Sequence, residues 1–249
     1  MIFRQLFEPL SSTYTYLVGC EDTRLAVLID PVVNSIERDL GALHGLGLTL
    51  AFTLDTHIHA DHITAALHLK QRANSRIAAP AIDRLPCTDV GIVEGTPFQV
   101  GGLYIKPLHT PGHTSGHFAY VLDDCVFTGD ALLIEGCGRT DFQGGDAKAL
   151  YRSVTEKLLT LPDDYLVYPG HDYQQRRVSS IGQERARNPR LGQNKTLREF
   201  EQIMADLKLP YPKFIDHALP GNRQCGVCPQ DLPAQMTAYC ARMTESPQG

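Results

Sequence analysis

The densest group of potential metal ligands in the sequence lies at residues 56–62, directly after the apolar run 50–54. This segment contains His57, His59, Asp61 and His62. Neutral imidazole nitrogens and carboxylate oxygens are the ligands that proteins offer to zinc, iron and manganese ions. In an extended His-x-His segment both rings point the same way, because side-chain direction repeats every two residues. The segment therefore predicts a metal site at the end of a strand rather than a solvated loop that is rich in histidine.

Three further segments supply matching groups. His113 lies in a turn-rich loop after the run 103–108, Asp130 ends a short buried-strand pattern, and His171 follows an apolar strand and a glycine. Binding crevices in open sheets form at strand ends. We therefore expect four strand ends to bring these groups together.

The elements that must position these residues are strands and helices in alternation. Strands are predicted at 14–19, 25–31, 50–54, 77–81, 98–108 (a hairpin that turns at Gly101-Gly102), 118–122, 125–127 and 165–168. Helices are predicted at 36–46, 65–70, 146–159 and 196–207, with a polar loop at 185–190 and an irregular tail. Strand pairs followed by helices, repeated in two halves, predict an α/β fold of two packed mixed sheets with helices outside. Without a linker-like change in composition, residues 1–249 are interpreted as a single domain, of which 172–249 form a C-terminal extension.

Composition narrows the classes of partner. The net charge of −5 is mild and the basic residues are scattered, so no nucleic-acid partner is expected. No apolar run approaches the roughly 18 residues that a membrane span needs. The start of the chain lacks the apolar core of a signal peptide, so a cytoplasmic location is predicted.

The chain has seven cysteines. Cys20, Cys87, Cys125 and Cys137 are isolated, and we interpret them as buried thiols. Cys225 and Cys228 form a single C-x-x-C, which without a second ligand pair is weak evidence for zinc. A structural or incidental role is the preferred interpretation, with a thiol near the active site as the alternative.

The order and spacing of the candidate ligands resemble the ligand set of the metallo-β-lactamase superfamily. That set comprises His57, His59, Asp61, His62, His113, Asp130 and His171. The resemblance implies an αββα sandwich that holds its metals between the sheet edges. It also assigns Asp30 a structural role beside the histidine-rich segment that begins at residue 56, called the histidine loop below. His109 and His117 are interpreted as packing or hydrogen-bonded residues.

A finer resemblance is to the persulfide dioxygenases (sulfur dioxygenases), which are relatives of glyoxalase II. The supporting segments are 56–64, 136–143, 168–173, 184–190 and 222–226. The last two matter most, because they lie outside the metal core that the whole superfamily shares.

This resemblance implies a non-haem Fe(II) oxidoreductase with one iron per chain. The iron ligands would be His57, His113 and Asp130, a pattern that is also typical of non-haem iron oxygenases. The residues His59, Asp61, His62 and His171 would orient these ligands, although in hydrolytic relatives the same four bind a second metal. The substrates would be glutathione persulfide and O2, and the products sulfite and glutathione. A homodimer is common among such relatives.

Glutathione carries two carboxylates, so cationic and hydrogen-bonding contacts are expected. By resemblance the leading contacts are Arg139 and Tyr173, with Arg176 and Arg177 as secondary candidates. An arginine offers a planar fork that suits a carboxylate. The resemblance also suggests that Cys225 lies near the pocket.

Three alternative functions remain at this point. The first is a glyoxalase II-like thioester hydrolase with two metals, which would use all seven candidate ligands. The second is another hydrolase of the superfamily, such as a lactonase. The third is a metal-binding protein without enzymatic activity.

Overall fold

The computed structural model describes residues 1–234 and residue 240. The first of its two sheets contains the N-terminal strands. This mixed six-stranded sheet has the order β1-β2-β3-β4-β5-β6. Its strands are β1 (Ile2–Glu8), β2 (Thr13–Gly19), β3 (Leu25–Ile29), β4 (Thr49–Leu54), β5 (Arg76–Pro80) and β6 (Val90–Ile92). The pairs β1–β2 and β2–β3 are antiparallel, and the strands from β3 to β6 are parallel.

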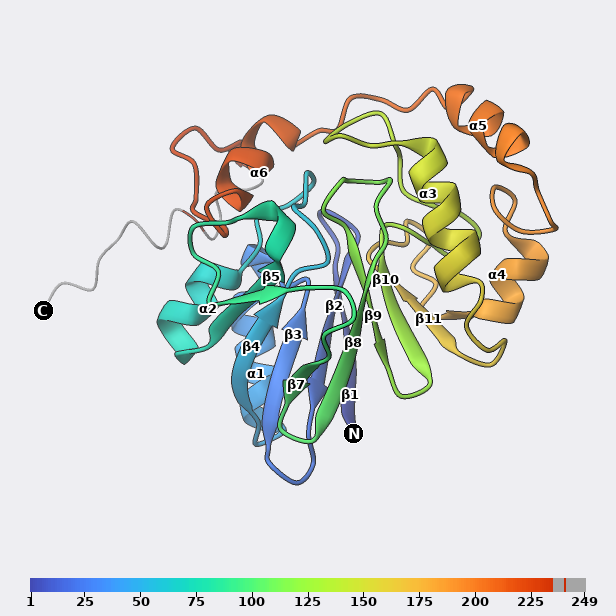
Figure 1. Cartoon of the computed structure of the whole chain (residues 1–249). Coiled ribbons are helices and arrows are strands. Elements are labelled where there is room, and N and C mark those ends of the chain that lie inside the picture. Colours follow the sequence, from blue (N-terminus) through green and yellow to red (C-terminus); the bar gives the residue numbers. More distant parts are fainter. Residues whose placement is uncertain (235–239, 241–249) are drawn as a thin grey trace, which may run out of the picture.

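The second sheet is also mixed and six-stranded, with the order β12-β11-β10-β9-β8-β7. Its strands are β7 (Phe98–Val100), β8 (Leu103–His109), β9 (Phe118–Leu122), β10 (Cys125–Gly129), β11 (Leu166–Pro169) and β12 (Ser179–Ser180). Only the pair β10–β11 is parallel. The two sheets pack against each other, and helices cover their outer faces (Figure 1).

An aromatic cluster fills much of the space between the sheets. Tyr16 of β2 meets Phe127 of β10 with ring centroids 4.9 Å apart, and Tyr168 of β11 lies 5.6 Å from Tyr16. Every residue of β2 is buried. This burial follows from the two-residue period of a strand: Tyr16 faces the opposite sheet, whereas Leu17 faces the helices.

Helices from different parts of the chain cover the two sheets. The first sheet packs against α1 (Ile36–Gly45), α2 (Ala66–Ala73) and α6 (Ile215–Asn222). The second packs against α3 (Ala147–Ser153), which continues as a π-helical turn to Leu158, and against α4 (Ile181–Arg187) and α5 (Leu197–Ala205). In Figure 1 the first group lies on the left and the second on the right.

The predicted αββα sandwich is confirmed, and two local predictions are wrong. The sequence predicts a loop at 185–190, but α4 includes Arg185–Arg187 and ends before Pro189. It also predicts an irregular tail, but this part of the chain contains α6, whose hydrophobic side packs against the first sheet. The extension that begins at residue 172 thus covers parts of both sheets, and its status as part of one domain stays a prediction.

The cysteines differ from the expectation at one position. Cys20, Cys125 and Cys137 are buried free thiols, as predicted. Cys87 is not, because it forms a disulfide with Cys225. Sequence alone could not show this pairing, since 138 positions separate the two residues.

The two cysteines of the C-x-x-C motif do not bond to each other. Cys225 bonds to Cys87, and Cys228 forms a disulfide with Cys240.

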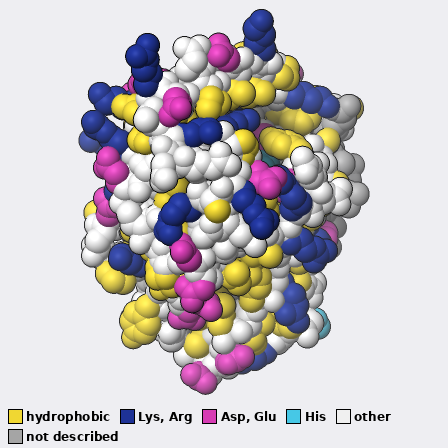
Figure 2. All heavy atoms as spheres, turned by 90° about the vertical axis from the view of Figure 1, so that its right-hand side faces the viewer, with side chains coloured by type: hydrophobic (Ala, Val, Ile, Leu, Met, Phe, Trp, Pro, Cys, Tyr) yellow, Lys and Arg dark blue, Asp and Glu magenta, His cyan; other side chains and the backbone are white. Residues whose placement is uncertain are grey.

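The face of the molecule that carries α4 and α5 has no dominant charge (Figure 2). Figure 2 shows basic and acidic side chains interspersed on the face that carries α4 and α5. Within residues 1–234 and 240, no helix is long and apolar enough to cross a membrane.

Candidate metal centre

The candidate ligands lie where strands of both sheets end. His57 follows β4 of the first sheet. His113 follows β8, Asp130 follows β10 and His171 follows β11, all in the second sheet. The candidate ligands therefore gather at strand ends of both sheets, which is the position that the resemblance implied.

Three of these residues form a compact set of donors. His57, His113 and Asp130 each offer one ligand atom, and these atoms all lie within 4.8 Å of one another. Nε2 of His113 lies 3.6 Å from Oδ2 of Asp130. The rings of His57 and His113 meet edge to face with centroids 4.9 Å apart, so both can direct a nitrogen into the same space.

Hydrogen bonds select the ring nitrogen that each histidine leaves available. The hydroxyl of Thr56 donates to Asp30 at 2.9 Å, so its oxygen accepts from Nδ1 of His57, also at 2.9 Å. Nδ1 of His113 donates to the carbonyl oxygen of Arg139 at 2.8 Å. In the neutral form of either ring, Nε2 is then the nitrogen without a proton, which can bind a metal.

Asp130 is held through its backbone and its side chain. Its backbone N–H donates to Nε2 of His117 at 3.0 Å, and Nδ1 of His117 bonds to Thr110 at 2.8 Å. Nδ1 of His171 donates to Oδ1 of Asp130 at 2.7 Å. Oδ2 is thus the carboxylate oxygen that faces His113. The interpretation of His117 as a hydrogen-bonded residue is confirmed. Asp30 accepts hydrogen bonds from the backbone and hydroxyl of Thr56, and its structural role stays a prediction.

A second cluster adjoins the first. His59, Asp61 and His62 offer donor atoms that also lie within 4.8 Å of one another. Asp61 accepts from both sides, since its Oδ2 lies 2.8 Å from Nδ1 of His62 and 2.9 Å from Nε2 of His171. His59 directs Nε2 to Asp30 at 3.2 Å. Six of the seven predicted ligand candidates therefore form two adjoining groups, and His171 bonds to one residue of each, Asp130 and Asp61.

The surroundings favour a neutral imidazole and an ionised carboxylate. Burial, reinforced by the nearby His59 and His113, holds the pKa of His57 well below its usual value. Burial alone would raise the pKa of Asp130, but the charge and hydrogen bond of His171 lower it. For His171 itself, the carboxylates of Asp130 and Asp61 outweigh burial and raise the pKa well above its usual value.

A cavity of about 620 Å³ opens beside the donors. His113, Asp130 and His171 line its floor, and residues 209–215 of the extension form part of its wall. Tyr173 also lines it, with its ring stacked on that of His171 at a centroid distance of 6.2 Å.

The four predicted substrate contacts differ in position. Arg139 and Arg176 line the cavity, and both guanidinium groups already have acidic partners. Arg139 bonds to Asp141 at 2.6 and 2.7 Å, and Arg176 bonds to Asp172 and Glu135, each at 2.8 Å.

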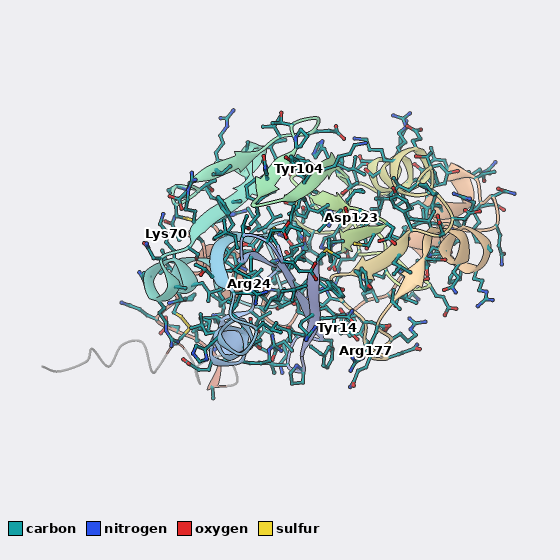
Figure 3. All side chains as sticks on the ribbon, turned by 90° about the horizontal axis from the view of Figure 1, so that it is seen from below. Tyr14, Arg24, Lys70, Tyr104, Asp123 and Arg177 are labelled. Atoms are coloured by element: carbon teal, nitrogen blue, oxygen red, sulfur yellow. A yellow bond between two sulfur atoms is a disulfide. The ribbon has the colours of Figure 1, made fainter. Side chains whose placement is uncertain are left out.

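Arg177 is absent from the lining residues. Figure 3 shows it at the edge of the molecule near Tyr14. Cys225 is also outside the lining, and its sulfur is bonded to Cys87.

The donor set suits a divalent metal ion. It offers two imidazoles and one carboxylate whose donor atoms lie within 4.8 Å of one another, and His113 and Asp130 line the cavity. Two imidazoles and a carboxylate with open positions are typical of non-haem Fe(II) sites.

Comparison with known proteins places the chain in a family. Residues 9–171 match the metallo-beta-lactamase superfamily. The human protein "Persulfide dioxygenase ETHE1, mitochondrial" is 46% identical over 235 residues, which cover 91% of this chain and 89% of that protein. The crystal structure of ETHE1 from Myxococcus xanthus has a TM-score of 0.89 and 53% identity, and the match covers 91% of this chain and 100% of that one. The chain belongs to the ETHE1 persulfide dioxygenase family.

A hydrolase of the same superfamily is also similar, though over less of the chain. The hydroxyacylglutathione hydrolase of Rhodopseudomonas palustris is 37% identical over 178 residues, which are 68% of this chain and 66% of that protein. ETHE1 relatives, in contrast, extend the match well into the C-terminal extension. Membership of the ETHE1 family implies a metal ion, which the two donor clusters could hold.

Two residues near the donors were given no role by the sequence, although Asn222 lies in the segment 222–226 that supports the resemblance. The hydroxyl of Thr13, on β2, lies 3.0 Å from Nε2 of His171, 3.2 Å from Nδ1 of His62 and 3.3 Å from Oδ2 of Asp61. Asn222, at the end of α6, bonds to the backbone of the histidine loop. Neither residue has a local signal, because both contacts depend on partners that lie far away in the chain.

Proposed function

We propose that this protein is a non-haem Fe(II) dioxygenase that oxidises glutathione persulfide to sulfite and glutathione. The observation that carries the proposal is the compact donor set of His57, His113 and Asp130, of which His113 and Asp130 line a large cavity, in a chain of the ETHE1 family. With atoms and charge balanced, glutathione persulfide, O2 and water give glutathione, sulfite and two protons.

The choice of iron rests on the chemistry that the reaction needs. A bound Fe(II) would supply the redox chemistry of O2, whereas zinc in the same place acts only as a Lewis acid. Two histidines and one carboxylate leave room on the metal for substrates. One iron per chain is therefore proposed.

The protein's own groups would fix the ligands in advance. Thr56 and the carbonyl of Arg139 orient the rings of His57 and His113, and His171 holds Oδ1 of Asp130. Such outer partners keep a ligand in one protonation state and one orientation. In this proposal His59, Asp61, His62 and His171 have that supporting role.

The cavity can receive a tripeptide that carries two carboxylates. Arg139 and Arg176 stand on its wall, so a substrate carboxylate would share these guanidinium groups with Asp141 and Asp172. Arginine has five N–H donors, which makes such sharing possible. Tyr173 is 76% exposed beside the donors and can pack along the glutathione backbone. Arg177 and Cys225 stay secondary in this proposal, because neither lines the cavity.

A thioester hydrolase with two metals is the second candidate. The donor cluster of His59, Asp61 and His62 favours it, as does the similarity to the hydroxyacylglutathione hydrolase. In that case these residues and His171 would bind a second ion.

One experiment separates the two candidates. Anaerobically purified, iron-loaded protein is mixed with glutathione persulfide, and O2 uptake, sulfite and metal content are measured on the same sample. We expect one O2 consumed for each sulfite formed, with one iron per chain. No O2 uptake, two metals per chain and cleavage of S-lactoylglutathione would instead identify a hydrolase.

The cytoplasmic location and the homodimer both stay predictions. The animal relatives are mitochondrial by name, so localisation of the tagged chain in its own cells would test the first. Light scattering of the purified protein would test the second.

A further inference from the structure

Asn222 connects the C-terminal extension to the histidine loop. Its side chain is 3% exposed. Nδ2 donates to the carbonyl oxygens of His59 and His62 at 2.8 and 2.7 Å, and Oδ1 accepts from the N–H of Thr64 at 2.9 Å. The amide thus uses both donor hydrogens and its acceptor on one loop.

These bonds matter because the loop has little regular structure of its own. Residues 55–65 form no strand or helix, although Val32 and Thr64 form an isolated bridge. The carbonyl of Ile58 also depends on a side chain, since it accepts from Gln143 at 2.7 Å. Buried backbone groups need partners, and here an amide from 160 positions away supplies them.

The position of Asn222 is itself fixed by the chain that follows. Cys225 forms the disulfide with Cys87, and its carbonyl oxygen accepts from the N–H of Leu67 at 3.0 Å. Gly226 has a φ of +95°, and a Cβ there would lie 2.1 Å from the carbonyl oxygen of Thr64. Only glycine permits this close approach. The segment 222–226 therefore packs against the histidine loop, and the disulfide between Cys225 and Cys87 fixes its position.

The loop in turn sets the place of the first ligand. His57 lies two residues before His59, and the centroids of their rings are 4.1 Å apart. A shift of the backbone at His59 and His62 would therefore move groups that pack directly against the metal donors.

We propose that Asn222 is a positioning residue for the metal centre, which it stabilises by holding the backbone of the loop 59–64. This inference rests on the proposed function, because it requires that His57, His113 and Asp130 bind iron. It adds a role for the extension: the helix α6 completes a site whose ligands all come from the superfamily core.

The test compares the affinity for Fe(II) of the full-length protein and its variants. Wild-type protein, Asn222→Ala and Asn222→Asp are titrated anaerobically with Fe(II) against a competing chelator. Asn222→Asp keeps the size of the side chain and the acceptor for Thr64, but it removes the amide donors. Loss of an outer partner typically weakens metal binding by about 10–100-fold, and we expect a loss in this range for both variants.

Asn188→Ala is the matched control. Asn188 is also buried, and its side chain makes four hydrogen bonds, to Gly136, Glu184, Arg190 and Leu191, and none to the histidine loop. We expect Asn188→Ala to lower the Tm of the metal-free protein at least as much as Asn222→Ala, with wild-type affinity for Fe(II). If Asn222 contributed only to general stability, the affinity for Fe(II) would fall together with Tm in both Asn222→Ala and Asn188→Ala.

Each outcome has one meaning. Wild-type affinity in either folded Asn222 variant, or an equal loss in Asn188→Ala, overturns the positioning role. If Asn222→Ala does not fold, Asn222→Asp decides alone, and failure of both to fold overturns a role specific to the metal centre. A wild-type protein that binds no iron would overturn the proposed function instead.

Discussion

His171 provides the sharpest test of how the metal centre is organised. Its two ring nitrogens bond to Asp130 at 2.7 Å and to Asp61 at 2.9 Å. The substitution His171→Phe keeps an aromatic ring in this buried position but removes both nitrogens. Asp130 would then lose the hydrogen bond to its Oδ1. That bond occupies Oδ1 and leaves Oδ2 available to bind a metal.

The expected magnitude follows from the bond that is lost. A hydrogen bond to a charged group contributes about 1.5–3 kcal/mol, and each 1.4 kcal/mol is about tenfold in affinity. We therefore expect Fe(II) to bind His171→Phe about 10–100-fold more weakly, which agrees with the usual effect of outer partners. The number of ions at saturation should stay at one per chain.

The assay is an anaerobic titration with Fe(II) in competition with a chelator, with metal content measured at saturation. His109→Phe is the control, since His109 packs on Phe118 and bonds to the carbonyl oxygen of Ser115, and neither of these two residues is a candidate donor. It should keep wild-type affinity. Unchanged affinity in His171→Phe would refute the orienting role. Two ions per wild-type chain, one of them lost in His171→Phe, would make His171 a ligand and favour the hydrolase.

Three further predictions concern single residues. Asp130→Ala should abolish iron binding and O2 uptake together, because it removes the only carboxylate of the donor set; full turnover with bound iron would contradict the assignment. Thr13→Val should weaken Fe(II) binding several-fold in the same titration, because it removes the hydroxyl that touches His171, with circular dichroism to check that the strand is intact. Burial raises the pKa of Asp39 to about 6 in spite of the guanidinium of Arg38. A carboxyl with a raised pKa adds stability that is fully present below about pH 4 and is lost as the pH rises through about 6. Asp39→Asn should therefore be more stable than wild type at pH 7, by up to about 3 kcal/mol, and the difference should shrink in urea unfolding at pH 4; a constant difference would argue against a buried charge.

The sequence predicts the candidate ligands because each of them follows the end of a strand. The pattern of apolar run, turn and histidine or aspartate is local, and it is enough to place His57, His113, Asp130 and His171 at one edge of the predicted sheets. The sheets follow from the same two-residue alternation, as in β2.

The supporting residues depend on contacts that no local pattern contains. Thr13 lies 158 positions from His171, and Asn222 lies 160 positions from His62. Helix α6 escapes prediction because Pro220 lies within its last turn, where a proline normally ends a helix. The disulfide of Cys87 escapes it for a similar reason: its partner is adjacent only in the folded chain.

The donors of the first cluster come from both sheets, so a bound iron would link iron supply to the lifetime of the protein. An ion held by His57 on one side and by His113 and Asp130 on the other would act as a cross-link between the two halves of the sandwich. A ligand that binds only the folded state stabilises it by about 2.7 kcal/mol at a hundredfold excess over its Kd. In iron-poor cells the chain would lose this contribution, and proteases would meet its unfolded form more often. We therefore expect its abundance to follow iron availability without any change in transcription.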